Sequence, residues 1–233
     1  MDILQVMNLK IKWKLYFDIK TLNIFFWIAI FALLLSYILV ISTNIWDVDI
    51  YSNYTIRSNY FYFSDILLPV VFMFNIIVLF GDFLDKINGE FIFSLPIKMF
   101  DFYWFRILRI VIIFLIPYIL FIGLLSIETE LSFFKCLFLS IPNFIFLLGF
   151  PAFVITVTKR IFYSFIICCG YIFLDLTSMG YLFENKSLFI NIFHAVYTDN
   201  EIIYNRLSFA VIGVLLIIIS YIIMNLNIYK KSL

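Results

Sequence analysis

The stretch CLFLSIPNFIFLLGFPAFVITV, residues 136–157, contains no charged side chain and only isolated polar ones. An α-helix needs about 20 predominantly apolar residues to cross the roughly 30 Å hydrocarbon core of a bilayer. Lipid offers no hydrogen-bond partners to a peptide backbone, so such a continuous run has to be helical. The stretch therefore predicts a transmembrane helix.

Five other stretches have the same character. They cover about residues 24–42, 64–80, 107–126, 161–178 and 207–226. A membrane β-barrel would show short segments of alternating polarity instead of continuous apolar runs. We therefore expect an all-α membrane protein with six transmembrane helices, organised as a single transmembrane domain over residues 1–233.

The composition agrees with a chain solvated by lipid. Of the 233 residues, 65% are hydrophobic and 13% are charged, whereas soluble domains average about 45–50% apolar and 25% charged residues. A net charge of +1 without a basic block gives no sign of a nucleic-acid partner. Cys136, Cys168 and Cys169 lie in apolar surroundings without a CxxC or Cys–His cluster, so we expect neither a disulfide nor a metal site.

The positions of lysine and arginine orient the chain. With the N-terminus inside, four of the 16 fall in outer segments (Arg57, Lys135, Lys186 and Arg206) and the other 12 in inner ones. Basic residues favour the cytoplasmic side, so we expect both termini in the cytoplasm. The dominance of Phe, Ile, Tyr, Asn and Lys, with few Ala and Gly, indicates an AT-rich bacterial genome. Residues 2–22 predict an interfacial helix on the inner leaflet, in contact with membrane lipid. A plain basic flank of the first span is the alternative.

The inner connection GDFLDKINGEFIFSLPIKMFDFYWFR, residues 81–106, is the most informative segment outside the spans. It carries acidic and basic residues yet remains rich in Phe, Ile and Leu, whereas a flexible tether would be polar. Gly89 can end a helix, and Pro96 forces Leu95 out of helical geometry. We expect a short amphipathic helix that docks on a partner. A loop packed against its own spans is the alternative.

Polar groups at membrane depth are the candidate functional residues. Such groups are costly in lipid and by default suggest a function. We single out Asn75, Asn143 and Asp175, together with Pro117, which can kink its helix, as candidates for a translocation path. Because Asp175 lies near the outer boundary, a structural or interfacial role is its alternative. The long outer loop 179–206 contains apolar runs too short to span, which predicts short re-entrant helices.

Motifs for catalysis by this chain itself are absent from the sequence. There is no GxxxxGK[ST] loop for nucleotide phosphates, no HExxH and no GxSxG. The single histidine, His194, has no ligand or base pattern around it. We therefore expect no catalytic residue, no metal and no cofactor in this chain.

The layout as a whole resembles the permease subunits of type-2 ABC exporters. The shared features are an N-terminal interfacial helix, six spans, and an inner loop between spans two and three that reads GEFIFSLPIKMFDFYWFRILR here. The family has a Gly and Glu, an apolar stretch, Leu-Pro, and a basic entry to span three. The matching positions are Gly89, Glu90, Ser94, Leu95, Pro96, Lys98, Arg106 and Arg109, while Phe91-Ile92-Phe93 departs from the family's Glu–Leu/Leu–Leu core.

This resemblance implies a coupling helix seated in a cleft of a separate cytoplasmic ATPase, which would bind ATP and Mg. The coupling residues it implies are Asp82, Asp85, Lys86, Gly89, Glu90, Leu95 and Pro96. It also implies a second permease copy or a sister permease, and re-entrant helices between spans five and six.

The small size and the Phe/Ile/Asn/Lys-rich composition are similar to those of permeases from low-GC Gram-positive bacteria that export antimicrobial peptides, including lantibiotic immunity exporters. We expect export of an amphipathic or hydrophobic substrate, by analogy a peptide. Export of a lipid, haem or drug is one alternative. A membrane sensor or assembly scaffold without transport is another.

Overall fold

The computed structural model describes residues 68–84, 99–128, 132–178 and 199–229, with seven residues between 27 and 38 and five between 182 and 188. The elements are α4 (Leu68–Leu84), α6 (Met99–Glu128), α7 (Phe133–Thr158), α8 (Ile161–Thr177) and α9 (Asp199–Tyr229). The seven residues between 27 and 38, within the first predicted span, are helical as well. No strand occurs among the described residues, so the prediction of an all-α chain is confirmed for them.

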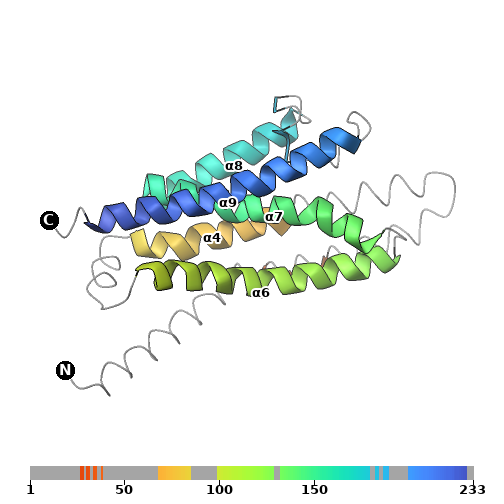
Figure 1. Cartoon of the computed structure of the whole chain (residues 1–233), viewed down its shortest axis with the longest axis horizontal. Helices are drawn as coiled ribbons and strands as arrows, with labels where there is room; N and C mark the ends of the chain where they lie inside the picture. Colours follow the sequence, from red (N-terminus) through yellow and green to blue (C-terminus); the bar gives the residue numbers. More distant parts are fainter. Residues whose placement is uncertain are drawn as a thin grey trace, which may run out of the picture.

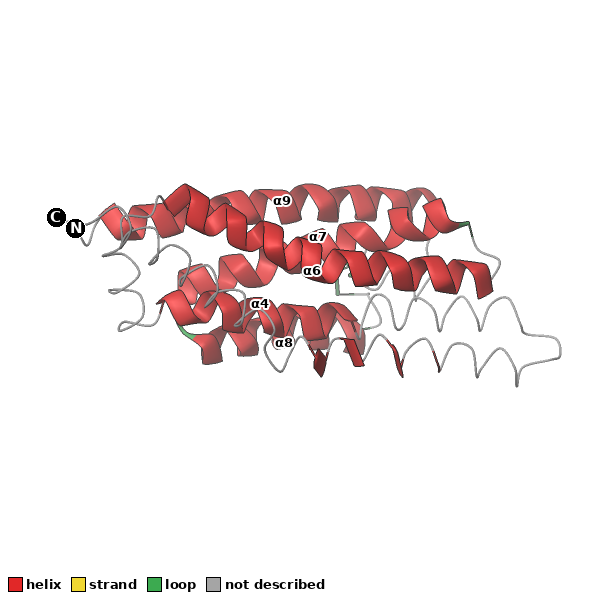
Figure 2. Cartoon of the chain, turned by 90° about the horizontal axis from the view of Figure 1, so that it is seen from below, coloured by secondary structure: helices red, strands yellow, loops and turns green. Residues whose placement is uncertain are grey.

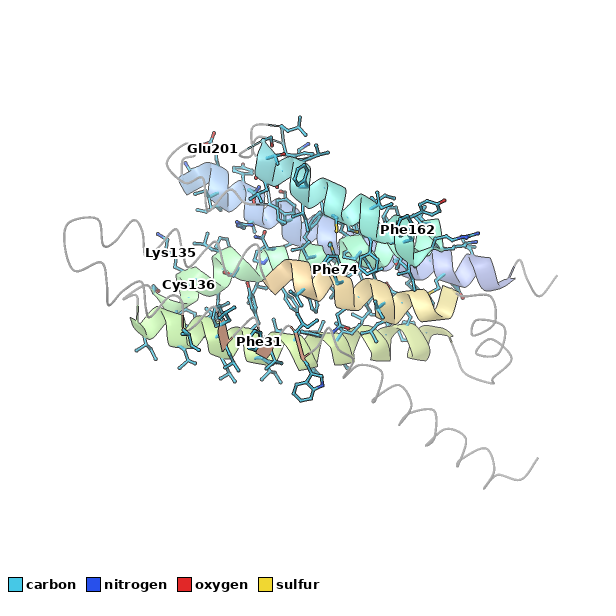
Figure 3. All side chains as sticks on the ribbon, turned by 180° about the vertical axis from the view of Figure 1, so that it is seen from behind. Phe31, Phe74, Lys135, Cys136, Phe162 and Glu201 are labelled. Carbon is cyan, nitrogen blue, oxygen red and sulfur yellow. The ribbon has the colours of Figure 1, made fainter. Side chains whose placement is uncertain are left out.

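The five helices lie along one another in an elongated bundle and alternate in direction (Figure 1; Figure 2 shows the bundle from below). α4, α7 and α9 run one way, and α6 and α8 run the other. Lys135 and Glu201, in the first turns of α7 and α9, accordingly lie toward one end, and Phe162 in the first turn of α8 toward the other (Figure 3). We call the end that holds the α7–α8 connection the turn end and the other the far end.

Two of the described helices are long and apolar enough to cross a membrane. They are α7 and residues Asn200–Leu226 of α9. The apolar portions of the other three are shorter: Val71–Gly81 in α4, Ile110–Leu124 in α6 and Ile161–Thr177 in α8. Judged by length and composition alone, two of the described helices, α7 and α9, are therefore candidate membrane spans.

The observed helices follow the predicted order but not all of the predicted boundaries. α8 matches the predicted span 161–178 closely, whereas α6 begins at Met99 rather than at residue 107. α9 begins at Asp199 rather than at residue 207, so Arg206 belongs to a helix and not to the outer loop to which the charge count assigned it. Hydropathy marks the apolar part of a helix, but backbone hydrogen bonding continues past it.

Parts of the predicted layout lie outside the described residues. These are the interfacial helix 2–22, most of the re-entrant segment, and the coupling residues Asp85, Lys86, Gly89, Glu90, Leu95 and Pro96. The remaining coupling residue, Asp82, falls in the last turn of α4. The connection with the proposed coupling helix thus leaves α4 after Leu84 and enters α6 at Met99, both at the turn end.

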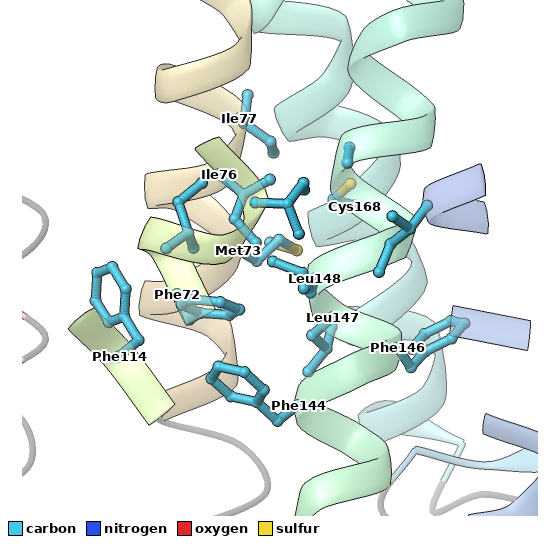
Figure 4. Close-up of a cluster of buried hydrophobic side chains, with 14 of the residues drawn as sticks. Phe72, Met73, Ile76, Ile77, Phe114, Phe144, Phe146, Leu147, Leu148 and Cys168 are labelled. Carbon is cyan, nitrogen blue, oxygen red and sulfur yellow. The ribbon is translucent and has the colours of Figure 1, made fainter. Parts of the chain in front are cut away.

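The core of the bundle lies around α7. In the most apolar stretch of α7, 72% of the residues are buried in the bundle, whereas in that of α9 only 28% are. α7 is therefore the central helix. Met73, Ile76 and Ile77 of α4 face Leu147 and Leu148 of α7 (Figure 4). The spacing of three and four in α4 places its apolar side chains on one face, as a packed helix requires.

The helices turn apolar side chains outward as well. Along α6, every fourth residue from 108 to 124 is a large exposed hydrophobic: Leu108, Ile112, Ile116, Leu120 and Leu124. On α9 a similar exposed row comprises Leu207, Val211, Leu215, Ile218, Ile222 and Leu226. Monomeric soluble proteins rarely expose contiguous apolar patches of more than a few hundred Å². The bundle is therefore apolar on its outside as well as in its core.

α7 and α9 cross with their backbones in contact at Gly149 and Gly213. A Cβ atom built on Gly213 would lie 2.7 Å from the carbonyl oxygen of Ile145 and 2.7 Å from the Cα of Phe146. A Cβ on Gly149 would collide with the carbonyl oxygen of Gly213. Only glycine on both helices allows this approach, as in close helix pairs of membrane proteins.

The α7–α8 connection is a tight turn. Lys159 adopts a left-handed conformation with φ 53°, and its N–H donates to the carbonyl of Ile155 at 2.9 Å. The hydroxyls of Thr158 and Ser164 lie 2.7 Å apart and tie the end of α7 to the start of α8. Lys159 and Arg160 are exposed, so two basic side chains project from the turn end.

Candidate functional site

Polar side chains from three helices converge at the far end of the bundle on a short chain segment that follows α8. The converging side chains and the two segment residues are all buried: Asn143 of α7, Asp175 of α8, Asn205 and Arg206 of α9, and Ser187 and Leu188 of the segment. We call these six residues the polar clamp. It contains five of the eleven buried polar or charged residues among those described.

Leu188 is held through both of its peptide groups. Its N–H donates to Oδ2 of Asp175 at 2.6 Å. Its carbonyl oxygen accepts from Nδ2 of Asn143 at 3.1 Å and from Nη1 of Arg206 at 3.2 Å. Buried backbone groups outside regular secondary structure need such partners, because an unpaired one costs about as much as a lost hydrogen bond. The three side chains thus replace the hydrogen bonds that a helix or sheet would provide.

The same side chains are linked to one another. Nη1 of Arg206 also donates to Oδ1 of Asn143, so the Asn143 amide accepts from α9 and donates to Leu188. Nδ2 of Asn205 donates to the carbonyl of Ser187 at 2.8 Å. Two consecutive residues of α9 therefore bind two consecutive carbonyl groups of the segment.

Asp175 and Arg206 carry opposite formal charges, and neither exposes any surface. An uncompensated buried charge costs several kcal/mol, because it gives up its hydration. In the polar clamp the carboxylate receives an N–H and the guanidinium donates to a carbonyl of the same residue, so each charge meets the favourable end of a peptide dipole. Charge-assisted hydrogen bonds of this kind are roughly twice as strong as neutral ones.

An aromatic layer lies one helical turn deeper. Phe146, Tyr171 and Phe209 occur three or four residues from a clamp residue on α7, α8 and α9, always on the side of the turn end. Phe146 meets the ring of Phe209 edge-on with centroids 4.6 Å apart, and Tyr171 at 5.9 Å. The layer separates the polar clamp from the aliphatic core.

The structure brings two of the four predicted path residues together. Asn143 and Asp175 both bind Leu188. Asn75 is fully buried in α4, three residues after Phe72, whose ring stacks on Phe144 at 4.5 Å.

Pro117, the fourth path residue, lies half-buried in α6, which continues through it without interruption. Tyr118, the next residue, stacks on Phe144 at 5.6 Å. α4 and α6, the helices of Asn75 and Pro117, thus contact α7 at Phe144, next to Asn143. These contacts are made by aromatic rings and not by Asn75 or Pro117.

Sequence reasoning missed Asn205 and Arg206, because it began the sixth span only at residue 207, whereas the helix begins at Asp199. A signal for the earlier start was present. Thr198 and Glu201 have the spacing of a capping box, in which a Ser or Thr begins a helix and a Glu three residues later supports it. That pattern starts the helix at Asp199 and places Arg206 two turns inside it.

The described residues contain no group of three or more His, Cys, Asp or Glu side chains arranged to hold a metal ion. Comparisons with protein-family models, with curated proteins and with solved structures find no match for this chain. The function is therefore argued from the residues and the geometry of the chain.

Proposed function

We propose that this chain is the transmembrane subunit of an ATP-driven exporter. It would cross the bacterial plasma membrane six times and expel an amphipathic or hydrophobic substrate, with energy from a separate ATPase subunit. The observation that carries the membrane part is the polarity of the bundle. Exposed leucines and isoleucines cover α6 and α9, while Asp175 and Arg206 are fully buried. Lipid solvates an apolar outer surface of this kind, and charged side chains in a membrane protein face the interior of the bundle. Soluble monomers rarely expose such large apolar surfaces to water.

The alternating helix directions support six crossings. Each described helix runs opposite to the next one along the chain, as successive spans must (Figure 1). The exposed basic pair Lys159 and Arg160 lies at the turn end. Basic residues favour the cytoplasmic side, so the turn end is the cytoplasmic end. The connection between α4 and α6 emerges there, within reach of a cytoplasmic ATPase.

The interior suits a largely apolar substrate. Asp175 and Arg206 are the fully buried charged residues among those described, and both are engaged with Leu188. Beneath them lies the aromatic layer of Phe146, Tyr171 and Phe209. A hydrophilic cargo would lack polar contacts along such an interior, whereas an amphipathic peptide would find apolar and aromatic ones.

Co-purification tests the proposal. The tagged chain, expressed with its neighbouring genes and reconstituted in lipid nanodiscs, is expected to retain an ATPase subunit and to stimulate ATP hydrolysis. A chain that inserts but retains no ATPase would overturn the exporter function and leave a sensor or scaffold. Cells protected from amphipathic peptides but not from small drugs would identify a peptide cargo.

Charge reversal at the end of α4 and on the α4–α6 connection tests the coupling residues. We expect Glu90→Lys, and the double change Asp82→Lys with Asp85→Lys, to prevent ATPase binding while insertion continues. Glu128→Lys is the matched control, because Glu128 ends α6 at the far end. Equal ATPase retention by Glu90→Lys and Glu128→Lys would show that the connection is not the docking site.

A further inference from the structure

A second side-chain cluster lies at the turn end, where α4 ends and α6 begins. It combines Phe80 of α4 with Phe100, Tyr103 and Trp104 of α6 and Tyr221 of α9. Tyr103 contacts both neighbours, with ring centroids 5.6 Å from Phe80 and 5.5 Å from Tyr221. Phe100 and Trp104 contact Tyr221 at 6.0 and 6.1 Å. These distances are those of interacting aromatic pairs. We call these five residues the aromatic anchor.

A hydrogen bond fixes the aromatic anchor to the backbone of α9. The Tyr103 hydroxyl donates to the carbonyl oxygen of Ile217 at 2.9 Å, and both groups are buried. Tyr103 lies in the second turn of α6, directly after the α4–α6 connection. This bond therefore joins the start of α6 to the backbone of α9 and not only to one of its side chains.

α9 itself is continuous from the aromatic anchor to the polar clamp. It runs unbroken from Asp199 to Tyr229 and contains no proline. Between the two clusters it touches α7 backbone to backbone at Gly149 and Gly213. On the turn-end side of this contact, the Ser220 hydroxyl donates to the carbonyl of Ala152 at 3.0 Å. The Ser220 hydroxyl is also in hydrogen-bond contact with the Tyr103 hydroxyl. α9 is thus attached to α6 through Tyr103 and to α7 through Ser220, and the two attachments meet at these hydroxyls.

We propose that α9 is a lever that couples the α4–α6 connection to the polar clamp, with the Gly149–Gly213 contact as its pivot. The inference rests on the proposed function, because an ATPase is what would move the connection. Tyr103 transmits the movement to α9, and Ser220 resists it. Release of Leu188 by Arg206 is the result at the far end.

The geometry makes small movements sufficient. Arg206 lies seven residues before Gly213 and Tyr221 eight residues after it, so the two arms measure about 10 and 12 Å at 1.5 Å per residue. A tilt of about 10° would move Arg206 by roughly 2 Å, comparable to the 1–2 Å helix shifts of known switching proteins. The 3.2 Å hydrogen bond from Arg206 to Leu188 would then exceed bonding range.

Labelling of a cysteine at position 187 reports on the polar clamp. Ser187 is buried and contributes its backbone carbonyl to the clamp, so Ser187→Cys keeps that contact. The native Cys136, Cys168 and Cys169 are first replaced by serine or alanine. The complex with its ATPase, in nanodiscs, is treated with a membrane-impermeant maleimide with and without ATP. ATP is expected to raise the labelling rate.

The lever predicts opposite effects from two mild variants. Tyr103→Phe keeps the ring but loses the bond to Ile217. It should reduce the ATP-dependent increase in labelling about threefold, the equilibrium factor of a typical hydrogen bond between membrane helices. Ser220→Ala loses the bond to Ala152 and the contact with the Tyr103 hydroxyl, while Tyr103 keeps its bond to Ile217. It should raise the rate without ATP by about the same factor. Tyr163→Phe, on the exposed face of α8, is the matched control and should change neither rate.

A double-mutant cycle tests the coupling itself. Arg206→Gln opens the polar clamp directly, so Tyr103→Phe should have no further effect in its presence. If the effects of Tyr103→Phe and Arg206→Gln on the labelling rate were additive, the lever would be overturned. It would also be overturned if Tyr103→Phe and Ser220→Ala shifted the labelling rate at position 187 in the same direction. An anchor with a merely structural role would loosen the clamp in both variants.

The failure of the lever is distinguishable from that of the proposed function. Stimulated ATP hydrolysis with a labelling rate at position 187 that ignores ATP overturns the lever alone. If no ATPase binds, the proposed function fails. Ser220→Ala and Arg206→Gln then still test the mechanical link in the chain alone, where an unchanged rate in Ser220→Ala and a raised one in Arg206→Gln would overturn it. The same two variants serve if Tyr103→Phe does not fold.

Discussion

The contact between α7 and α9 predicts that Gly213→Ala destabilises the protein, although alanine is the better helix former. The added methyl carbon would lie 2.7 Å from the carbonyl oxygen of Ile145 and 2.7 Å from both the Cα and the N of Phe146. All three obstacles are backbone atoms of α7, which cannot turn aside as a flexible side chain can. The two helices must separate at their crossing.

The size of the effect follows from that separation. Carbon atoms in contact prefer about 3.5–4.0 Å, so α9 has to move by nearly 1 Å. Overpacking of this kind costs roughly 1–3 kcal/mol. Stretching the Ser220 bond to Ala152 adds about 0.6 kcal/mol, a typical value for a hydrogen bond between membrane helices. The helix propensity gained with alanine offsets at most about 1 kcal/mol. The net loss is about 1–3 kcal/mol.

Thermal unfolding of the purified protein in detergent measures this loss. For a chain of this size about 2–4 °C in Tm corresponds to each kcal/mol, so Gly213→Ala should lower Tm by about 2–12 °C. Gly149→Ala should behave alike. The double variant should lose less than the sum, because the first methyl group has already separated the helices.

Two other helical glycines provide matched controls. A Cβ on Gly170 would meet no atom within 4 Å, and a Cβ on Gly123 would lie 3.6 Å from the ring of Phe133, an ordinary contact. Alanine at either position should leave Tm unchanged or raise it. If Gly213→Ala proved as stable as Gly170→Ala, the backbone contact and the pivot inferred from it would both be refuted.

Three further predictions use the same thermal assay. Asp175→Leu leaves the buried N–H of Leu188 without its acceptor and should cost about 1–3 kcal/mol, whereas Asp175→Asn keeps an acceptor and should cost less than half of that; equal losses would argue against the polar clamp. Lys159→Gly relieves a left-handed residue and should raise stability by up to about 1 kcal/mol relative to Arg160→Gly, since Arg160 has φ −137° and the two variants remove the same charge; the reverse order would contradict the turn geometry. Gly81→Ala meets only the Ile161 side chain, with Cγ1 nearest and Cδ1 2.7 Å away, so it should cost less than a clash with the α7 backbone and be rescued by Ile161→Ala, and failure of that rescue would place the strain elsewhere.

Much of the secondary structure follows from the sequence because its cause is local. An apolar run without charged residues has to satisfy its backbone within itself, so residues 161–178 predict a helix that the structure has at Ile161–Thr177. Polar side chains in such runs require partners, so the sequence alone indicates Asn143 and Asp175 as candidate functional residues. The number of crossings, the orientation and the ATPase partner remain predictions.

The sequence by itself therefore determined the helical class, the order of the helices, and which polar residues needed an explanation. Only the tertiary structure decided what those residues bind. Asn143 and Arg206 are 63 positions apart, and both meet Leu188 only because α7 and α9 lie side by side in the same direction. Nothing in the sequence pairs Gly149 with Gly213, and only the crossing of α7 and α9 brings their backbones into contact. Hydropathy records how apolar a helix is, but carries no information on which face of it meets which neighbour.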